Sequence, residues 1–210
     1  MKWFNQDKVM INFNELTFPS EPFAILKENY LNALEKKQSA VEAIVISSIG
    51  KNMKYADARY VNLKYVTNNS LIFFSNYQSN KASQFNEHKD SMVSATIYWD
   101  SIDVQIRMRG YITKSSSELS DSHFHGRDDS KNALAISSKQ SMEANNYEDV
   151  VKNYQYTLDK INLSKRPSYW GGYEIKPVYF EFWKAHKFRI NKREVYEKTN
   201  NDWNHYFLQP

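Results

Sequence analysis

The stretch ARYVNLKYVTNNSLIFFS, residues 58–75, contains two apolar-rich runs that are separated by Asn68-Asn69. The runs predict strands from Ala58 to Thr67 and from Ser70 to Ser75, and the Asn-Asn pair is typical of a hairpin turn. Similar runs on both sides predict further strands at 43–47, 92–99, 104–112, 173–183, 188–190 and 194–198, and residues 203–208 close the chain. Many antiparallel strands joined by tight turns favour a barrel over a parallel α/β sheet.

Helices are predicted around this barrel. Pro19, Ser20 and Pro22 mark the start of a helix that runs to about residue 37, and a short helix is expected over 80–88. The polar segment at about 115–165 predicts a helical insertion, with one helix near 117–124 and another over 147–161. Residues 1–20 are interpreted as an irregular arm and 21–210 as one domain. The Gly171-Gly172 pair is predicted to mark a tight turn into a strand.

Composition narrows the class of protein. The 210 residues are 41% hydrophobic and contain no cysteine, which excludes disulfide scaffolds, zinc–thiolate sites, iron–sulfur clusters and cysteine nucleophiles. No run has the length and apolarity of a transmembrane helix or signal peptide, so we expect a cytoplasmic protein without a membrane partner. The net charge of +4 suits a phosphorylated small ligand. A basic nucleic-acid-binding barrel stays an alternative, although no nucleic-acid motif is present and no such partner is expected.

Two stretches favour an anion site. Arg59 and Lys64 lie on opposite faces of one predicted strand and can flank a ligand that runs along it, because arginine offers bidentate contacts to phosphate and lysine a mobile charge. Ser75, Ser79 and Lys81 surround the junction between a strand end and a helix start, a natural place for phosphate. The alternatives are solvated charges on a sheet edge and an ordinary helix cap at Ser79.

Three later groups add candidates. Gln105, in a predicted strand, can present a donor and an acceptor to a ring edge, or simply be exposed. The run from His123 to Arg127 suits anion capture, whereas its His-x-His spacing lacks the further ligands of a metal site, so no metal is expected. Residues 189, 191 and 193 are predicted to project from one side of a strand beside Trp183, where they would bind an anionic aromatic ligand or remain solvated.

Taken together, these pieces resemble the pyridoxamine 5′-phosphate oxidase family in order and spacing. The similarity extends from about residue 20 to the C-terminus. It rests on Arg59–Lys64, Phe74-Ser75, Ser79-Asn80-Lys81, Gln105, Gln140-Ser141, Trp170–Tyr173, Glu181-Phe182-Trp183, Arg189–Arg193 and Leu208-Gln209-Pro210.

The resemblance implies an FMN-binding split β-barrel, mainly β with helices, that forms a homodimer with two flavins at the subunit interface. Phe74 stands where the family has Tyr, and Asn80 where it has Arg. The implied flavin-binding residues are Arg59, Tyr60, Val61, Asn62, Leu63, Lys64, Phe74, Ser75, Ser79, Asn80, Lys81, Gln105, Gln140, Ser141, Trp183 and Arg193.

The resemblance also implies an activity, the oxidation of pyridoxine or pyridoxamine 5′-phosphate to pyridoxal 5′-phosphate with dioxygen. This chain departs from the family pattern at His123, Lys131 and Asn191, all of which belong to the implied substrate set. A related flavin oxidase of the phenazine-biosynthesis type and a non-catalytic flavin-binding protein stay open. The implied substrate residues are Lys64, His123, Arg127, Lys131, Arg189 and Asn191, with Arg189 as the catalytic candidate that orients the substrate.

Overall fold

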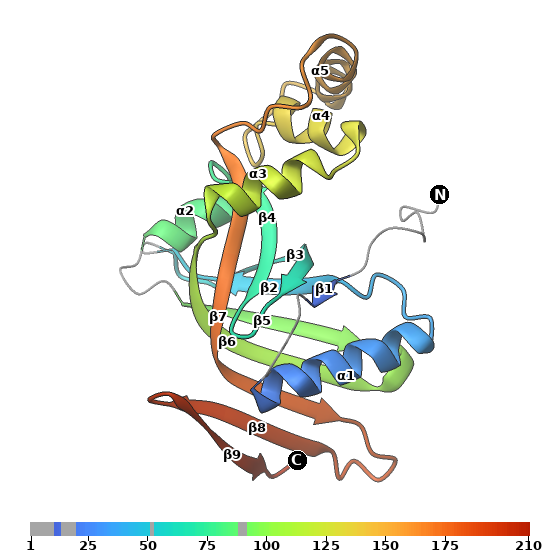
Figure 1. Cartoon of the computed structure of the whole chain (residues 1–210), viewed down its shortest axis with the longest axis vertical. Helices are drawn as coiled ribbons and strands as arrows, with labels where there is room; N and C mark the ends of the chain where they lie inside the picture. Colours follow the sequence, from blue (N-terminus) through green and yellow to red (C-terminus); the bar gives the residue numbers. More distant parts are fainter. Residues whose placement is uncertain (1–10, 14–19, 51–52, 88–91) are drawn as a thin grey trace.

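The structure is a computed structural model, and it describes residues 11–13, 20–50, 53–87 and 92–210. Helices and strands alternate irregularly along these ranges (Figure 1). The elements are β1 (Asn12–Phe13), α1 (Glu21–Glu35), β2 (Ala43–Ser48), β3 (Asp57–Val66), β4 (Leu71–Asn76), α2 (Asn80–Asn86), β5 (Met92–Trp99), a 3₁₀ turn (Asp100–Ile102), β6 (Val104–Lys114), α3 (Ser117–His125), α4 (Asp129–Ser137), α5 (Tyr147–Lys160), β7 (Trp170–Lys184), β8 (Lys192–Thr199) and β9 (Asp202–Leu208).

Six strands close into a barrel in the order β3, β2, β5, β6, β7 and β4, because β4 pairs with both β7 and β3. All pairs within this ring are antiparallel, and β8 and β9 continue the sheet beyond β7. The 15-residue strand β7 pairs with β4 near its start and with β8 near its end. The predicted antiparallel split barrel is confirmed.

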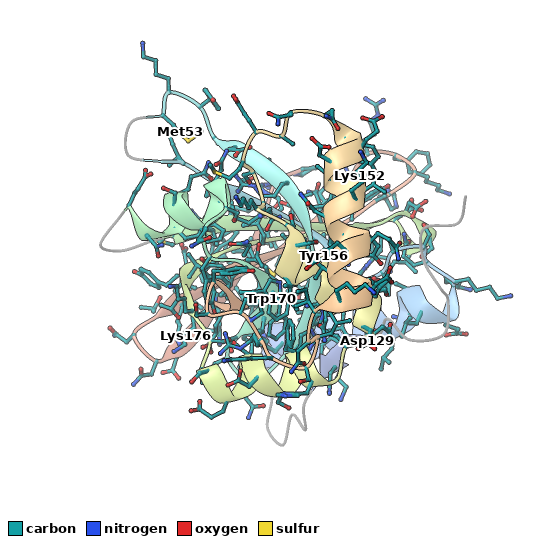
Figure 2. The ribbon with its side chains drawn as sticks, turned by 90° about the horizontal axis from the view of Figure 1, so that it is seen from above. Met53, Asp129, Lys152, Tyr156, Trp170 and Lys176 are labelled. Atoms are coloured by element: carbon teal, nitrogen blue, oxygen red, sulfur yellow. The ribbon has the colours of Figure 1, made fainter. Side chains whose placement is uncertain are left out.

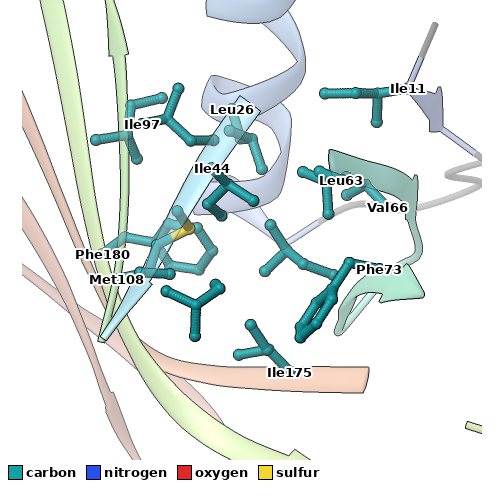
Figure 3. Close-up of a cluster of buried hydrophobic side chains, with 14 of the residues drawn as sticks. Ile11, Leu26, Ile44, Leu63, Val66, Phe73, Ile97, Met108, Ile175 and Phe180 are labelled. Carbon is teal, nitrogen blue, oxygen red and sulfur yellow. The ribbon is translucent and has the colours of Figure 1, made fainter. Parts of the chain in front are cut away.

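The barrel interior is filled by residues that alternate with more exposed ones along β2, β5 and β6, whereas β4 is buried over nearly its whole length. Ile44, Phe73, Met108 and Phe180 are each at most 1% exposed, and α1 adds Leu26 to the same core (Figure 3). Burying a large apolar side chain contributes about 1.5–3 kcal/mol relative to leaving it in water. The period-2 pattern that predicted the strands is therefore the pattern of inward-facing side chains.

Residues 188–190 do not form the predicted strand. They lie in a turn between β7 and β8, where the Arg189 N–H donates to the His186 carbonyl oxygen at 2.8 Å. Arg189 has φ of 60°, in the left-handed region that a strand cannot accommodate. Phe188 and Ile190 are 70% and 64% exposed, so the apolar alternation that suggested a strand reflects no buried face.

Gly171 and Gly172 also differ from their prediction, since they lie inside β7 and not in a turn. Both pair with β4, at Ser75 and Phe74 respectively. A Cβ atom on Gly172 would clash with Ser115 Oγ, and one on Gly171 with the Tyr77 hydroxyl. The two glycines therefore let another segment approach the strand closely.

The remaining differences concern helices and the N-terminal arm. Residues 129–137 form α4, a helix that was not separately predicted within the polar segment. Most of the predicted arm, 1–10 and 14–19, lies outside the described residues, but Asn12–Phe13 pairs in parallel with β3, so this part is strand. None of the helices in the described ranges has the length and apolarity that crossing a membrane requires.

Candidate functional site

The end of β4 and the start of α2 bury a lysine among hydroxyl groups. Lys81 is 8% exposed, and its Nζ donates to Ser75 Oγ at 3.2 Å and to Ser79 Oγ at 3.4 Å. Burial lowers the pKa of Lys81, and the positive charge of Arg59 lowers it further. Because both hydrogen-bond partners are neutral, the ammonium is suited to a ligand that brings negative charge.

Gln140, from the connection between α4 and α5, reaches the same strand end. Its Oε1 accepts from Ser75 Oγ and from the Asn76 N–H, both at 3.4 Å. Asn76 Nδ2 also donates to the Ser138 carbonyl oxygen at 3.4 Å, which holds this connection in place. Ser141 follows in the left-handed region, with φ of 72°. The structure thus brings two predicted flavin residues, Gln140 and Ser75, into contact.

Arg59, on β3, is held by a set of protein groups. Its guanidinium donates to the Ile46 carbonyl oxygen (3.2 Å), Ser48 Oγ (2.7 Å) and Gln84 Oε1 (2.8 Å), and it forms an ion pair with Asp57. Gln84 in turn donates to Asp57, and this hydrogen bond, together with Arg59, lowers the pKa of Asp57. Sequence reasoning missed Asp57 and Gln84, which fix the orientation of Arg59 near Lys81.

The other residues of this stretch have different surroundings. Tyr60 and Asn62 are exposed on the outer face of β3, whereas the Leu63 side chain is 1% exposed in the core. Val61 is half-buried and packs against that core, and Asn80 is exposed at the start of α2. Among these predicted flavin residues, Leu63 can therefore contact a ligand only through its backbone.

An aromatic stack lies beside this strand end. Phe74 stacks on His123 with ring centroids 3.7 Å apart and planes 9° from parallel, and on Trp170 at 5.4 Å and 14°. The Tyr65 hydroxyl lies 2.9 Å from His123 Nδ1. Burial lowers the pKa of His123 to about 4, helped by the charges of nearby cations, so the imidazole is neutral at pH 7.

A cavity of about 220 Å³ lies beside the stack, and its lining includes Phe74, Trp170, Arg127 and Lys131. The Arg127 guanidinium lies 4.3 Å from the Trp170 ring centroid, and its Nη2 donates to the Lys131 carbonyl oxygen at 2.8 Å. Its Nη1 is buried and has no hydrogen-bond partner in the described part of the chain. Burial lowers the pKa of Arg127 to about 10. Burial also lowers the pKa of Lys64, and the positive charges of Lys131 and Arg127 lower it further.

A second group of candidates lies across β6, β7 and β8. Gln105 is the register partner of Trp183, and Trp183 is the partner of Arg193. Arg193 Nε donates at 2.8 Å to Glu181, which is 2% exposed. This row lies beside a cavity of about 290 Å³, whose lining includes Ser94, Thr96, Arg107, Arg109, Tyr179, Glu181 and Arg193.

Glu181 is the buried centre of this second group. Arg107 Nη1 and the Tyr179 hydroxyl both donate to its Oε2 at 3.0 Å, while Arg193 bonds to Oε1. Burial opposes ionisation of Glu181, but the hydrogen bonds from Arg193 and Tyr179 outweigh it, and the pKa of Glu181 is lowered. Glu181 therefore orients Arg193, a role that the predicted site residues did not include.

The structure separates the three residues that were predicted to share one side of a strand. Arg193 lies in β8, Arg189 lies in the preceding turn, and Asn191 precedes the strand. Asn191 Oδ1 accepts from the His186 N–H at 3.0 Å, so its side chain braces the turn that carries Arg189. The prediction of a common face is wrong, because the left-handed Arg189 breaks the alternation.

The two groups occupy different ends of β7. The first lies at Trp170, beside the helices α3 and α4, and the second lies at Trp183, beside β8 (Figure 1). Figure 2 looks down onto the helical end, with Trp170 near the centre of the view and Lys152 and Tyr156 marking α5. The two cavities share no lining residue. One chain therefore presents two half-sites, each with a different set of predicted flavin residues.

The closed antiparallel barrel places the chain in the class of split-barrel proteins, and comparison with known proteins agrees. A Nostoc punctiforme structure described as a pyridoxamine 5′-phosphate oxidase-related, FMN binding protein has this fold, with a TM-score of 0.72 at 13% identity over 90% of this chain and 97% of its own. Residues 170–210 match the "Pyridoxine 5′-phosphate oxidase C-terminal dimerisation region".

Relatives that span nearly the whole chain are more specific. The pyridoxine/pyridoxamine 5′-phosphate oxidase of Cytophaga hutchinsonii is 31% identical over 199 residues, 93% of this chain and 90% of the relative. That of Legionella pneumophila strain Lens is 31% identical over 202 residues, 95% and 93% of the two chains. PhzG from Burkholderia lata 383, in complex with tetrahydrophenazine-1-carboxylic acid, superimposes with a TM-score of 0.85 at 26% identity, covering 96% and 99%. The chain belongs to the pyridoxine/pyridoxamine 5′-phosphate oxidase family of flavoprotein oxidoreductases.

Proposed function

We propose that this protein binds FMN and oxidises pyridoxine or pyridoxamine 5′-phosphate to pyridoxal 5′-phosphate, with dioxygen as the electron acceptor. The observation that carries the substrate half is the buried Arg127 Nη1, which has no hydrogen-bond partner among the described residues and lies in a cavity with aromatic and cationic walls. A buried guanidinium N–H without a partner is costly, so a phosphate oxygen that accepts from it stabilises the site.

The first half-site fits the flavin phosphate. Lys81, Ser75 and Ser79 offer a buried cation and hydroxyl donors, and Arg59 lies close enough to affect the pKa of Lys81. In the second half-site Gln105 would face the ring edge, next to Trp183 and Arg193. When bound, FMN supplies the redox chemistry, accepting a hydride from the C4′ carbon of the substrate and passing electrons to dioxygen.

The chain's own part is to bind and orient the substrate. Lys64, Arg127 and Lys131 would hold its phosphate, with His123 beside them as a neutral group at pH 7. Arg189, from the turn before β8, would orient the reacting carbon. Asn191 would hold that turn through the His186 N–H, in addition to the substrate contact predicted for it.

We infer that a homodimer assembles the complete site, because one chain presents the two halves at opposite ends of β7. The outer face of the barrel supports this inference, since Tyr60, Tyr98 and Tyr111 are 75%, 55% and 45% exposed there. Aromatic residues are enriched in subunit interfaces. Light scattering should give twice the chain mass, and a monomer with bound flavin would contradict the inference.

Two measurements test the function. Purified protein should be yellow and should release about one FMN per subunit on denaturation. With pyridoxamine 5′-phosphate it should then consume dioxygen and form pyridoxal 5′-phosphate, and Arg127→Ala should weaken substrate binding roughly ten- to a hundredfold through the lost charged hydrogen bond. A colourless protein that does not bind added FMN would contradict the cofactor assignment. A yellow protein that does not turn over pyridoxamine 5′-phosphate would contradict the substrate assignment.

A second candidate is oxidation of a carboxylated polycyclic amine. It is favoured by the similarity to PhzG, whose structure contains tetrahydrophenazine-1-carboxylic acid, and by His123, Lys131 and Asn191, at which the chain departs from the resemblance. The aromatic stack of Phe74 and Trp170 suits a flat ligand, and Arg127 suits a carboxylate. Oxidation of tetrahydrophenazine-1-carboxylic acid faster than pyridoxamine 5′-phosphate would select this candidate.

A further inference from the structure

Tyr65 contacts His123, a predicted substrate residue that stacks on Phe74 in the cavity lining. It lies on β3 directly after Lys64, and its hydroxyl approaches His123 Nδ1 at 2.9 Å across 58 residues of sequence. Its ring also meets the His123 ring edge-on, with centroids 5.5 Å apart. One face of the imidazole is covered by Phe74 at 3.7 Å. These contacts hold the His123 ring in both position and orientation.

The contacts also determine which nitrogen of His123 carries the proton. The imidazole is surrounded by Lys64 from β3, Arg127 from the connection after α3 and Lys131 from α4, and Asp128 pairs with Lys131 at 3.0 Å. Burial and these three cations keep the ring neutral, so it has one N–H and one acceptor nitrogen.

We assign the Tyr65 hydroxyl as the donor of this pair. Burial raises the pKa of Tyr65, so its hydroxyl remains protonated, and an imidazole nitrogen is a better acceptor than a phenol oxygen. A donated O–H at Nδ1 leaves the proton of His123 on Nε2. The other nitrogen then presents an N–H and no positive charge.

We propose that Tyr65 is a positioning residue that fixes His123 as a neutral Nε2–H donor for the anionic group of the substrate. This proposal rests on the proposed function in one respect: it takes the anionic group of the substrate to be a phosphate. The predicted phosphate site would then combine the cations Lys64, Arg127 and Lys131 with one uncharged donor. His123 would keep the same protonation state from about pH 5 to pH 8.

The test uses the full-length FMN-loaded protein with inorganic phosphate as the probe. Nitrogen-15 NMR of the histidine side chains reports which ring nitrogen carries the proton, and His123→Gln identifies the His123 signal by its loss. We expect Nε2–H in wild-type protein, and no titration of His123 between pH 5 and pH 8. In Tyr65→Phe we expect a mixture of tautomers and a phosphate Kd raised about three- to tenfold, the effect of one hydrogen bond.

Three single variants serve as controls. Tyr156→Phe removes a hydroxyl from a tyrosine that is 63% exposed on α5 and should leave the tautomer and the phosphate Kd unchanged (Figure 2). His123→Gln offers a neutral N–H donor and should retain phosphate affinity within about threefold, whereas His123→Phe should raise the phosphate Kd about three- to tenfold, as Tyr65→Phe does. A glutamine side chain has no tautomers for Tyr65 to select. Adding Tyr65→Phe to His123→Gln should therefore raise the phosphate Kd little further.

The proposal is overturned if wild-type His123 carries its proton on Nδ1, if it titrates near pH 6.5, or if Tyr65→Phe alters neither tautomer nor phosphate affinity. Its failure is separate from that of the proposed function, since phosphate binding is measured without turnover. A protein that binds phosphate through neutral His123 but does not oxidise pyridoxamine 5′-phosphate would support the proposal and reject the oxidase substrate.

Discussion

Glu181→Gln should destabilise the protein more than any other removal of one carboxylate charge near the second half-site. Glu181 is 2% exposed and accepts from Arg193 at 2.8 Å, from Arg107 at 3.0 Å and from Tyr179 at 3.0 Å. Glutamine keeps one acceptor oxygen, but it turns an amide toward one of the arginines. Removing one partner of a buried ion pair typically costs about 3–5 kcal/mol.

The structure places the expected cost below that range. The side chains of Arg107 and Arg193 are 53% and 27% exposed, so both guanidinium groups regain contact with water when the carboxylate charge is removed. We therefore expect a loss of about 2–3 kcal/mol in the free energy of unfolding. For a chain of this size that loss lowers Tm by about 5–10 °C.

Thermal unfolding followed by circular dichroism measures the effect, with Glu197→Gln as the matched control. Glu197 is 47% exposed and pairs with Arg109 at 3.6 Å, and a glutamine there can still accept from the Tyr206 hydroxyl. Its Tm should change by less than about 2 °C, because exposed ion pairs contribute little. Equal Tm changes in the two variants, or an unchanged Tm in Glu181→Gln, would refute the reasoning.

Three further outcomes are expected. Gly110→Ala places a Cβ 2.5 Å from the Lys176 carbonyl oxygen and should cost about 1–3 kcal/mol in urea unfolding, whereas Gly126→Ala, with its nearest contact at 3.7 Å, should not. His123 has a pKa of about 4, below its ordinary value of 6.5, so its stabilising contribution is present above pH 6.5 and is lost toward pH 4. Wild-type protein should therefore lose about 1–2 kcal/mol more than His123→Gln across that range in urea unfolding, and equal losses would contradict the assignment. Lys81→Met should raise the FMN Kd roughly ten- to a hundredfold in fluorescence titration, and an unchanged Kd would place the flavin elsewhere.

The barrel strands were predictable because their signal is local. The alternation from Met92 to Trp99 gave a strand with the bounds that the structure has, and each inward residue there faces the core. The Gly171-Gly172 pair was misread for the opposite reason. The reason for two glycines lies at Tyr77 and Ser115, far away in sequence, and a dipeptide alone does not distinguish a turn from a close approach of two segments.

The candidate site was predictable where residue type alone suggests chemistry, as at Lys81 and Arg127. The groups that hold such residues were missed, because their signals are contacts between distant segments. Gln140 meets Ser75, 65 residues away, and Tyr65 meets His123 across 58. The resemblance to a known family supplied Gln140, whereas Tyr65 had neither a local pattern nor a family motif to mark it.

The length of β7 sets the separation between the two half-sites. A continuous strand of 15 residues, at about 3.3 Å per residue, spans on the order of 50 Å, and one half-site is anchored near each end. One inserted or deleted residue between Gly172 and Trp183 would shift one anchor and reverse which face every later side chain occupies. Changes of chain length that fall within β7 should therefore abolish assembly of the site.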